Sequence, residues 1–164
     1  MDGGGKGPPM KTRISVALVF SLPLLFVAQG FAQDDIKDHP SCRRCGMDRK
    51  QFSHSRMLLE FDNGETIGTC SLRCMAMELN ENAGRKTRSL KVSDYDSRAL
   101  LEAEKATWVI GGNVRGVMTK RAKWAFREKE AARRFIRSSG GDIASFLQAI
   151  QAANEDLRAE GKHR

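Results

Sequence analysis

Apolar and polar positions in the first half of the chain follow the pattern of a β-hairpin. Residues 57–61 (MLLEF) and 65–69 (ETIGT) are two segments of strand length. The Asp-Asn-Gly between them, at 62–64, is typical of a tight turn, because Asn-Gly tolerates the positive φ values that such turns require. The pattern therefore predicts two antiparallel strands.

A helix is predicted directly after this hairpin. Ser71 is placed to cap its N-terminus, and the helix should continue to about Asn82, with Gly84 ending it. Residues 89–94 (SLKVSD) then alternate at Leu90 and Val92, which indicates a further strand.

The second half repeats this layout. It contains a predicted strand at 106–110, a turn at 111–113, a strand at 122–126, a helix at 128–138, and Gly140-Gly141 where that helix ends. We infer two ββα units, each closed by a further strand or extended segment. The expected fold is α+β, with two ββαβ-like units forming one small domain over 39–147.

The last segment, 142–160, has the spacing of an amphipathic helix. Asp142 is the expected cap, and the apolar positions of one face are Ile143, Phe146, Leu147, Ile150 and Leu157. Covering one face of the sheet is the expected role of this added C-terminal helix, and binding a partner is the alternative.

Residues 1–32 have the layout of a signal peptide. A short basic segment at 10–13, whose Met10 is also a candidate initiator, precedes the apolar residues 14–27. This apolar stretch of about 14 residues suits a signal-peptide core and is shorter than the ~20 residues that span a bilayer. We expect cleavage after Ala32 and a flexible polar leader at 33–38, with a retained membrane anchor as the alternative. No cysteine stands at the cleavage point, so a lipid anchor is not expected. We expect a periplasmic protein that contacts the membrane only before cleavage.

The formal net charge of +8 does not by itself indicate a binding partner. The basic residues form short, scattered clusters, which favours a solvated basic surface over a dedicated binding face. An exported chain rarely meets nucleic acid, so nucleic acid is not an expected partner.

The four cysteines, Cys42, Cys45, Cys70 and Cys74, are the main candidates for chemistry. In an oxidising compartment they could form two disulfides. Paired cysteines at these spacings are also typical of a tetrathiolate zinc site, although export argues against it. A redox pair stays open, but the strand–Cys-x-x-Cys–helix order is missing. Covalent haem is excluded, because Gly46 stands where histidine is required.

The methionines make copper a further candidate metal. Cu(I) prefers thiolate and thioether donors, whereas most zinc sites avoid methionine. Met47 lies two residues after Cys45, and His39 is near enough to add an imidazole. Met118 lies in a polar loop, where an apolar side chain has little packing reason to be.

The hexapeptide CRRCGM (42–47) resembles the Cys-x-x-Cys-Gly-Met signature of the NosL family of periplasmic copper chaperones. Members of this family are accessory proteins for nitrous oxide reductase assembly. The resemblance extends over about residues 39–147, through the segments LLEFDNGETIGTCSLRC, VSDY, KATWVIGG, GVMTKRAKWAF and AARRFIRSSGGDI.

This resemblance implies two ββαβ-type units, distantly similar to the core of organomercurial lyase, and one bound Cu(I). The implied ligands are Cys45, Met47 and Met118, with Cys42 as a further candidate. Cys70 and Cys74 are not part of the usual signature. They could bind a second metal, extend the copper site or form a disulfide.

We therefore predict an exported metallochaperone that is not an enzyme. It would bind Cu(I) and pass it to a copper-accepting client protein or assembly complex, such as nitrous oxide reductase or its assembly machinery. The alternatives are a thiol-based enzyme, acting by thiol–disulfide exchange or organomercurial-type cleavage, and a binding module stabilised by zinc or disulfides.

Overall fold

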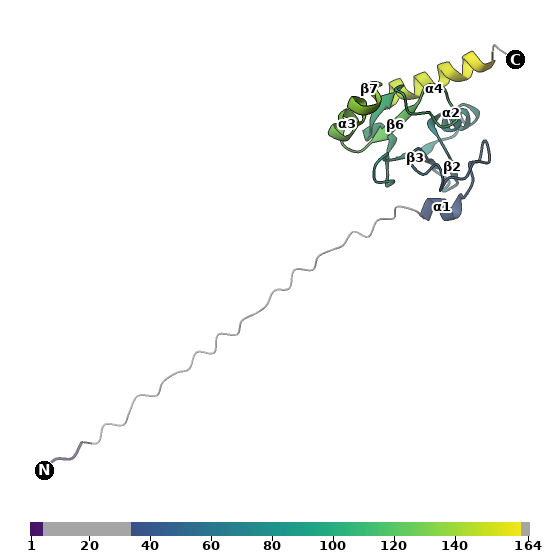
Figure 1. Cartoon of the computed structure of the whole chain (residues 1–164). Coiled ribbons are helices and arrows are strands. Elements are labelled where there is room, and N and C mark those ends of the chain that lie inside the picture. The colour runs from purple at the N-terminus through teal and green to yellow at the C-terminus, as the bar shows by residue number, and fades with distance from the viewer. Residues whose placement is uncertain (5–33, 162–164) are drawn as a thin grey trace.

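The computed structural model describes residues 1–4 and 34–161 of the 164-residue chain (Figure 1). Beyond residue 4, the predicted signal peptide and its cleavage point lie outside these ranges. The strands are β1 (Met57–Phe61), β2 (Thr66–Thr69), β3 (Thr87–Ser93), β4 (Leu100–Glu102), β5 (Thr107–Ile110), β6 (Lys123–Phe126) and β7 (Asp142–Ala144). The helices are α1 (Asp34–Asp38), α2 (Leu72–Glu81), α3 (Lys129–Ser139) and α4 (Phe146–Gly161), with a 3-10 turn η1 (Ala103–Lys105). None of the helices in the described ranges is long and apolar enough to cross a membrane.

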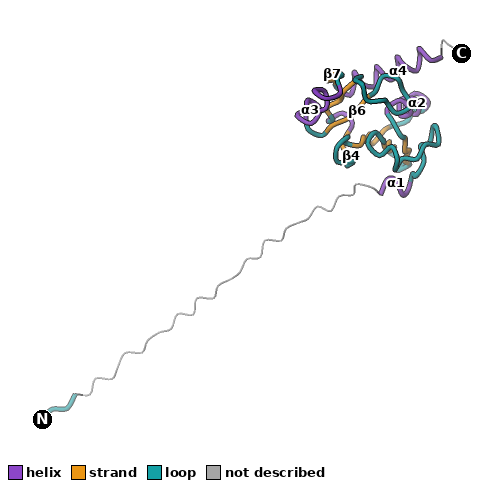
Figure 2. The backbone as a smooth tube through the Cα atoms, in the orientation of Figure 1, coloured by secondary structure: helices purple, strands orange, loops and turns teal. Residues whose placement is uncertain are grey.

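Two antiparallel sheets share the same arrangement of three strands, and the first sheet has β4 as an additional edge strand. The first has the strand order β2-β1-β3-β4, and the second has the order β6-β5-β7. In each sheet the first strand is central, its hairpin partner lies on one side, and the strand after the helix lies on the other. This arrangement confirms the α+β fold with two ββαβ units. The strands and the helices around them are distinguished by colour in Figure 2.

Local signals place the first hairpin and its helix. Gly64 has φ of 84°, and its N–H donates to the Phe61 carbonyl oxygen over 2.9 Å, so the predicted turn forms. Ser71 caps α2 by accepting a hydrogen bond from the Cys74 N–H at 3.4 Å. The helix therefore begins between two of the cysteines, which fixes their relative position.

Two hydrophobic clusters fill the interior. The first packs β1, β2, β3 and α2 against α4. The second joins the two units, because it contains Cys42, Cys70 and Cys74 of the first unit together with apolar side chains of β5, β6 and α3. The cysteines thus lie where the first unit meets the core of the second.

The predicted helix over 142–160 is wrong at its start. Asp142–Ala144 is strand β7, and it pairs with β5 through Ile110↔Asp142 and Trp108↔Ala144. Helix α4 begins only at Phe146. Ser145 and Gln148 form a capping box there, in which the Ser145 hydroxyl accepts from the Gln148 N–H and the Gln148 side chain accepts from the Ser145 N–H.

The leader predicted to be flexible at 33–38 contains a helix. Asp34–Asp38 forms α1, and Asp35 is buried between two buried arginines, with Arg49 at 2.8 Å and Arg56 at 3.0 Å. Because two buried guanidinium groups need a counter-charge, this carboxylate fixes the segment onto the domain. Composition alone did not reveal this partner.

Candidate metal centre

A tight loop positions the first cysteine pair. The Cys42 N–H donates to the Met47 carbonyl oxygen over 2.8 Å, and the Gly46 N–H donates to the Cys42 carbonyl oxygen over 2.9 Å. Gly46 adopts φ of 73°, a left-handed conformation that favours glycine. The chain therefore folds back within this loop and holds both cysteines in it.

Arg49 fastens this loop to the end of the first hairpin. Its guanidinium donates to the Thr69 carbonyl oxygen over 3.1 Å and to the Met57 carbonyl oxygen over 2.9 Å. The Arg43 N–H also donates to the Gly68 carbonyl oxygen over 2.9 Å. As a result, the loop is held beside the residue that directly follows β2, which is Cys70.

The second pair comes from the junction of β2 and α2. Cys70 follows the last residue of β2, and its carbonyl oxygen accepts a 2.7 Å hydrogen bond from the Ser55 hydroxyl. Cys74 lies in the first turn of α2, where the helix dipole favours negative charge.

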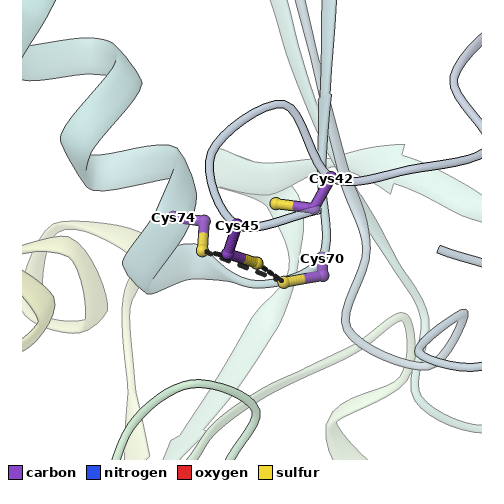
Figure 3. Close-up of side chains that lie close together, drawn as sticks. All are labelled: Cys42, Cys45, Cys70 and Cys74. Carbon is purple, nitrogen blue, oxygen red and sulfur yellow. Dashed lines mark hydrogen bonds between the residues drawn. The ribbon is translucent and has the colours of Figure 1, made fainter. Parts of the chain in front are cut away.

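The four sulfur atoms converge on one point, as Figure 3 shows for the four side chains. All four lie within 4.8 Å of one another, and all four cysteines are free thiols. The Cys45–Cys70 distance is 3.5 Å, and the Cys70–Cys74 and Cys74–Cys45 distances are both 3.8 Å. Cys42, Cys70 and Cys74 are buried, while Cys45 is half-buried.

The sulfur group stabilises one negative charge more readily than several. Hydrogen bonding from the Cys70 and Cys74 thiols lowers the pKa of Cys42 well below its usual range. The hydrogen bond from Cys70 to Cys42 raises the pKa of Cys70, and the separate hydrogen bond from Cys74 to Cys42 is the main cause that raises the pKa of Cys74 to about 12. A soft cation that replaced the remaining protons would relieve this competition between thiols.

The two candidate methionines share a different surface. Met47 and Met118 both line a cavity of about 940 Å³ between the cysteine loop, α2 and the 115–120 loop. Met118 is 40% exposed and adopts φ of 57°, whereas Met47 is half-buried and packs against the cluster that contains the cysteines. Their assignment as ligands stays a prediction.

His39, the other candidate, lies apart from the sulfur group. Its Nε2 is within 2.8 Å of the Thr66 hydroxyl, at the edge of the first sheet. Burial, and secondly the charge of Arg49, lowers the pKa of His39. Among the described residues, the group that could hold a metal consists of the four cysteines, with no imidazole or carboxylate.

His54 is a cavity-lining residue that the sequence did not indicate. It lines the cavity together with Met47 and Met118, and its ring lies 5.4 Å from Trp124 and 5.8 Å from Tyr95. Burial first, and the charge of Arg98 second, lowers the pKa of His54, so the ring is neutral at neutral pH and can offer a lone pair. A single histidine between two serines carries no local signal of this role.

Comparison with solved structures supports the fold. The chain is similar to the crystal structure of the copper chaperone NosL from Shewanella denitrificans, with a TM-score of 0.53 and 21% sequence identity. The match covers 65% of this chain and 86% of that one. A search of curated proteins gives no match. The family model for NosL matches residues 33–153, which include α1, both sheets and all four cysteines, so the chain belongs to the NosL family.

Proposed function

We propose that this protein is an exported metallochaperone that carries Cu(I) as its cargo. The observation that carries the proposal is the convergence of four free cysteines beside a cavity lined by two methionines, in a member of the NosL family. The similar structure from Shewanella denitrificans is that of a copper chaperone, which agrees with this cargo. We therefore infer a chaperone and not an enzyme.

Cys45, Met47 and Met118 are the proposed cargo ligands, with Cys42 as a further donor. Thiolate and thioether sulfur suit Cu(I), which also accepts low coordination numbers. Cys45 is the least buried of the four cysteines, and Met47 is only two residues away in the same loop. Met118 lies across the cavity on an exposed loop, where its side chain can reach the ion and leave again.

Cargo transfer would proceed by ligand exchange. An incoming donor of the client displaces the sulfur ligands one at a time, so copper is never released as a free ion. Two basic residues, Arg115 and Lys120, line the same cavity, and both are exposed. They would favour a client with an acidic surface around its copper-accepting site.

The client proposed from the family resemblance is nitrous oxide reductase or its assembly machinery. The predicted signal peptide places this transfer in the periplasm. Both statements rest on the sequence and family, and the cargo site itself can be tested separately from them.

The test is an anaerobic Cu(I) titration of the reduced chain against a chromophoric competing chelator. Met47→Ala and Met118→Ala should each weaken copper binding by at least about tenfold, or about 1.4 kcal/mol. Met77→Ala is the matched control, because Met77 is a half-buried methionine of α2 that does not line the cavity. Wild-type affinity in both cavity variants would refute the proposed Cys/Met site.

A further inference from the structure

Thiols and thioethers occupy different depths in this site. Three of the four thiols are buried, with exposed fractions of 3% for Cys42 and 0% for Cys70 and Cys74. The two thioethers, Met47 and Met118, instead line the open cavity. Cys45 alone is a half-buried thiol, and it belongs to the buried sulfur group and to the loop of Met47.

The spacing of the buried thiols matches a tetrahedral thiolate site. A metal–sulfur bond of about 2.3 Å places the sulfur atoms of a tetrahedral zinc site about 3.8 Å apart. Cys45, Cys70 and Cys74 have sulfur–sulfur distances of 3.5, 3.8 and 3.8 Å, which are close to the edges of one tetrahedral face. Cys42, within 4.8 Å of the other three, supplies the fourth corner (Figure 3).

We propose that Cys42, Cys45, Cys70 and Cys74 form a tetrathiolate site for one divalent ion such as Zn(II). This site contains neither methionine, and it shares Cys45 and the further donor Cys42 with the proposed copper cargo site. Four converging thiols are the number that a tetrahedral zinc ion uses. A Cu(I) ion, which accepts fewer ligands, would leave part of this buried set unused. Thioethers, which zinc sites avoid, lie outside the set.

The surroundings can compensate the charge of such a site. Zinc with four thiolates carries a net charge of about −2, which is costly to bury without positive partners. The Nε–H groups of Arg44 and Arg73 are buried and make no hydrogen bond within the described residues, and Arg44 Nε lies 3.7 Å from a carboxylate oxygen of Glu78. The pKa of each arginine is raised chiefly by a glutamate hydrogen bond, Glu81 for Arg44 and Glu160 for Arg73, and further by the charge of Cys74.

Positive charge and a helix terminus both act on Cys74. The charge of Cys74 interacts with both arginines, and Cys74 lies in the first turn of α2, at the positive end of the helix dipole. Both features favour an anionic sulfur group over neutral thiols.

Sharing of Cys45 couples the two sites. With zinc bound, Cys45 is a ligand of the buried ion, and it can serve copper only as a bridge or after leaving zinc. We therefore expect zinc loading to weaken Cu(I) binding at the cavity, while removal of a methionine leaves zinc binding unchanged.

The test uses the reduced, full-length chain with Co(II) as a spectroscopic probe and Zn(II) as the competitor. Co(II) should give the visible bands of a tetrahedral thiolate complex, saturating at one equivalent, and Zn(II) should displace it. Cys70→Ser should weaken Zn(II) binding by more than about 100-fold. This loss exceeds the one expected for a residue that only hydrogen-bonds to a metal ligand. Near-ultraviolet circular dichroism checks that this variant folds, and Cys42→Ser serves as a second ligand variant.

Two results would overturn the proposal. One is the absence of tetrahedral thiolate bands in the wild-type chain, including the case in which the four cysteines take up only Cu(I). The other is Zn(II) affinity that stays at the wild-type level in both folded cysteine variants. Failure of the copper proposal is recognised separately, since it appears as unchanged Cu(I) binding in Met47→Ala and Met118→Ala.

Discussion

The sulfur atoms of Cys45 and Cys70 lie 3.5 Å apart, although 25 residues separate them in the chain. Cys45 belongs to the loop that follows α1, and Cys70 to the junction between β2 and α2. The two short cysteine motifs therefore act as one four-sulfur group. The reactivity of each cysteine in this group then depends on its exposure to solvent.

Alkylation should distinguish the four cysteines by rate. Cys45 is half-buried, while the other three are buried, so in the metal-free reduced protein iodoacetamide should modify Cys45 first. Peptide mapping by mass spectrometry over a time course measures this order. Equal rates for Cys45 and Cys74 would contradict the burial of the group, and denatured protein, in which all four react, is the control.

Asp35→Asn should destabilise the fold strongly. The substitution leaves Arg49 and Arg56 buried without their shared carboxylate, and breaking a buried ion pair in this way costs about 3–5 kcal/mol. Urea unfolding followed by tryptophan fluorescence measures the loss. Asp38→Asn is the matched control in the same helix, because Asp38 is exposed. Similar losses in both variants would show that Asp35 has no special role.

Gly68→Ala should disturb the cysteine loop. A Cβ atom at this position would lie 2.6 Å from the guanidinium carbon of Arg49 and 2.6 Å from Cβ of His39. Arg49 is fully buried and cannot move aside, so we expect a loss of about 1–3 kcal/mol from overpacking. Gly84→Ala is the control, because its added Cβ meets nothing within 4 Å. Thermal unfolding of the two variants provides the comparison.

Asp156 should contribute stability that acid removes. Burial opposes its ionisation, but hydrogen bonds from Lys123, Arg121 and Thr119 outweigh this effect and lower its pKa. A carboxyl group with a lowered folded-state pKa stabilises the fold above its unfolded value, about 3.9, and this contribution is lost as the pH falls through the folded value. Asp156→Asn should therefore cost about 1–3 kcal/mol at neutral pH.

The pH series supplies the decisive measurement for Asp156. The difference in unfolding free energy between wild type and Asp156→Asn should shrink as the pH falls from 5 to below about 3.9. Glu155→Gln is the control, since Glu155 contacts Arg121 from a more exposed position. A difference that is constant over this range would contradict a role for the ionised carboxylate.

Much of the framework could be predicted from sequence because its signals are local. The Asp-Asn-Gly turn needs only a positive φ at Gly64, and the start of α2 needs only the hydroxyl of Ser71. The repeated strand–turn–strand–helix order then follows from the spacing of such signals, and the family signature at 42–47 is contiguous. These features involve contacts between residues close in the chain.

The features that the sequence did not reveal depend on distant contacts. A polar leader becomes α1 because Asp35 meets Arg49 and Arg56, and the start of the expected C-terminal helix becomes β7 because β5 offers an open edge. His54 enters the cavity only through packing on Tyr95 and Trp124.

The ββαβ repeat and the soft-metal signature can be derived from the order of the amino acids, because both depend on residues that are close in the chain. The meeting of Cys42, Cys45, Cys70 and Cys74, and the cavity that Met47 and Met118 line, come from three-dimensional packing. Spacing along the chain sets which ligands are available, whereas the buried ion pair of Asp35 and Arg49 and the packing of the two units set which ligands converge.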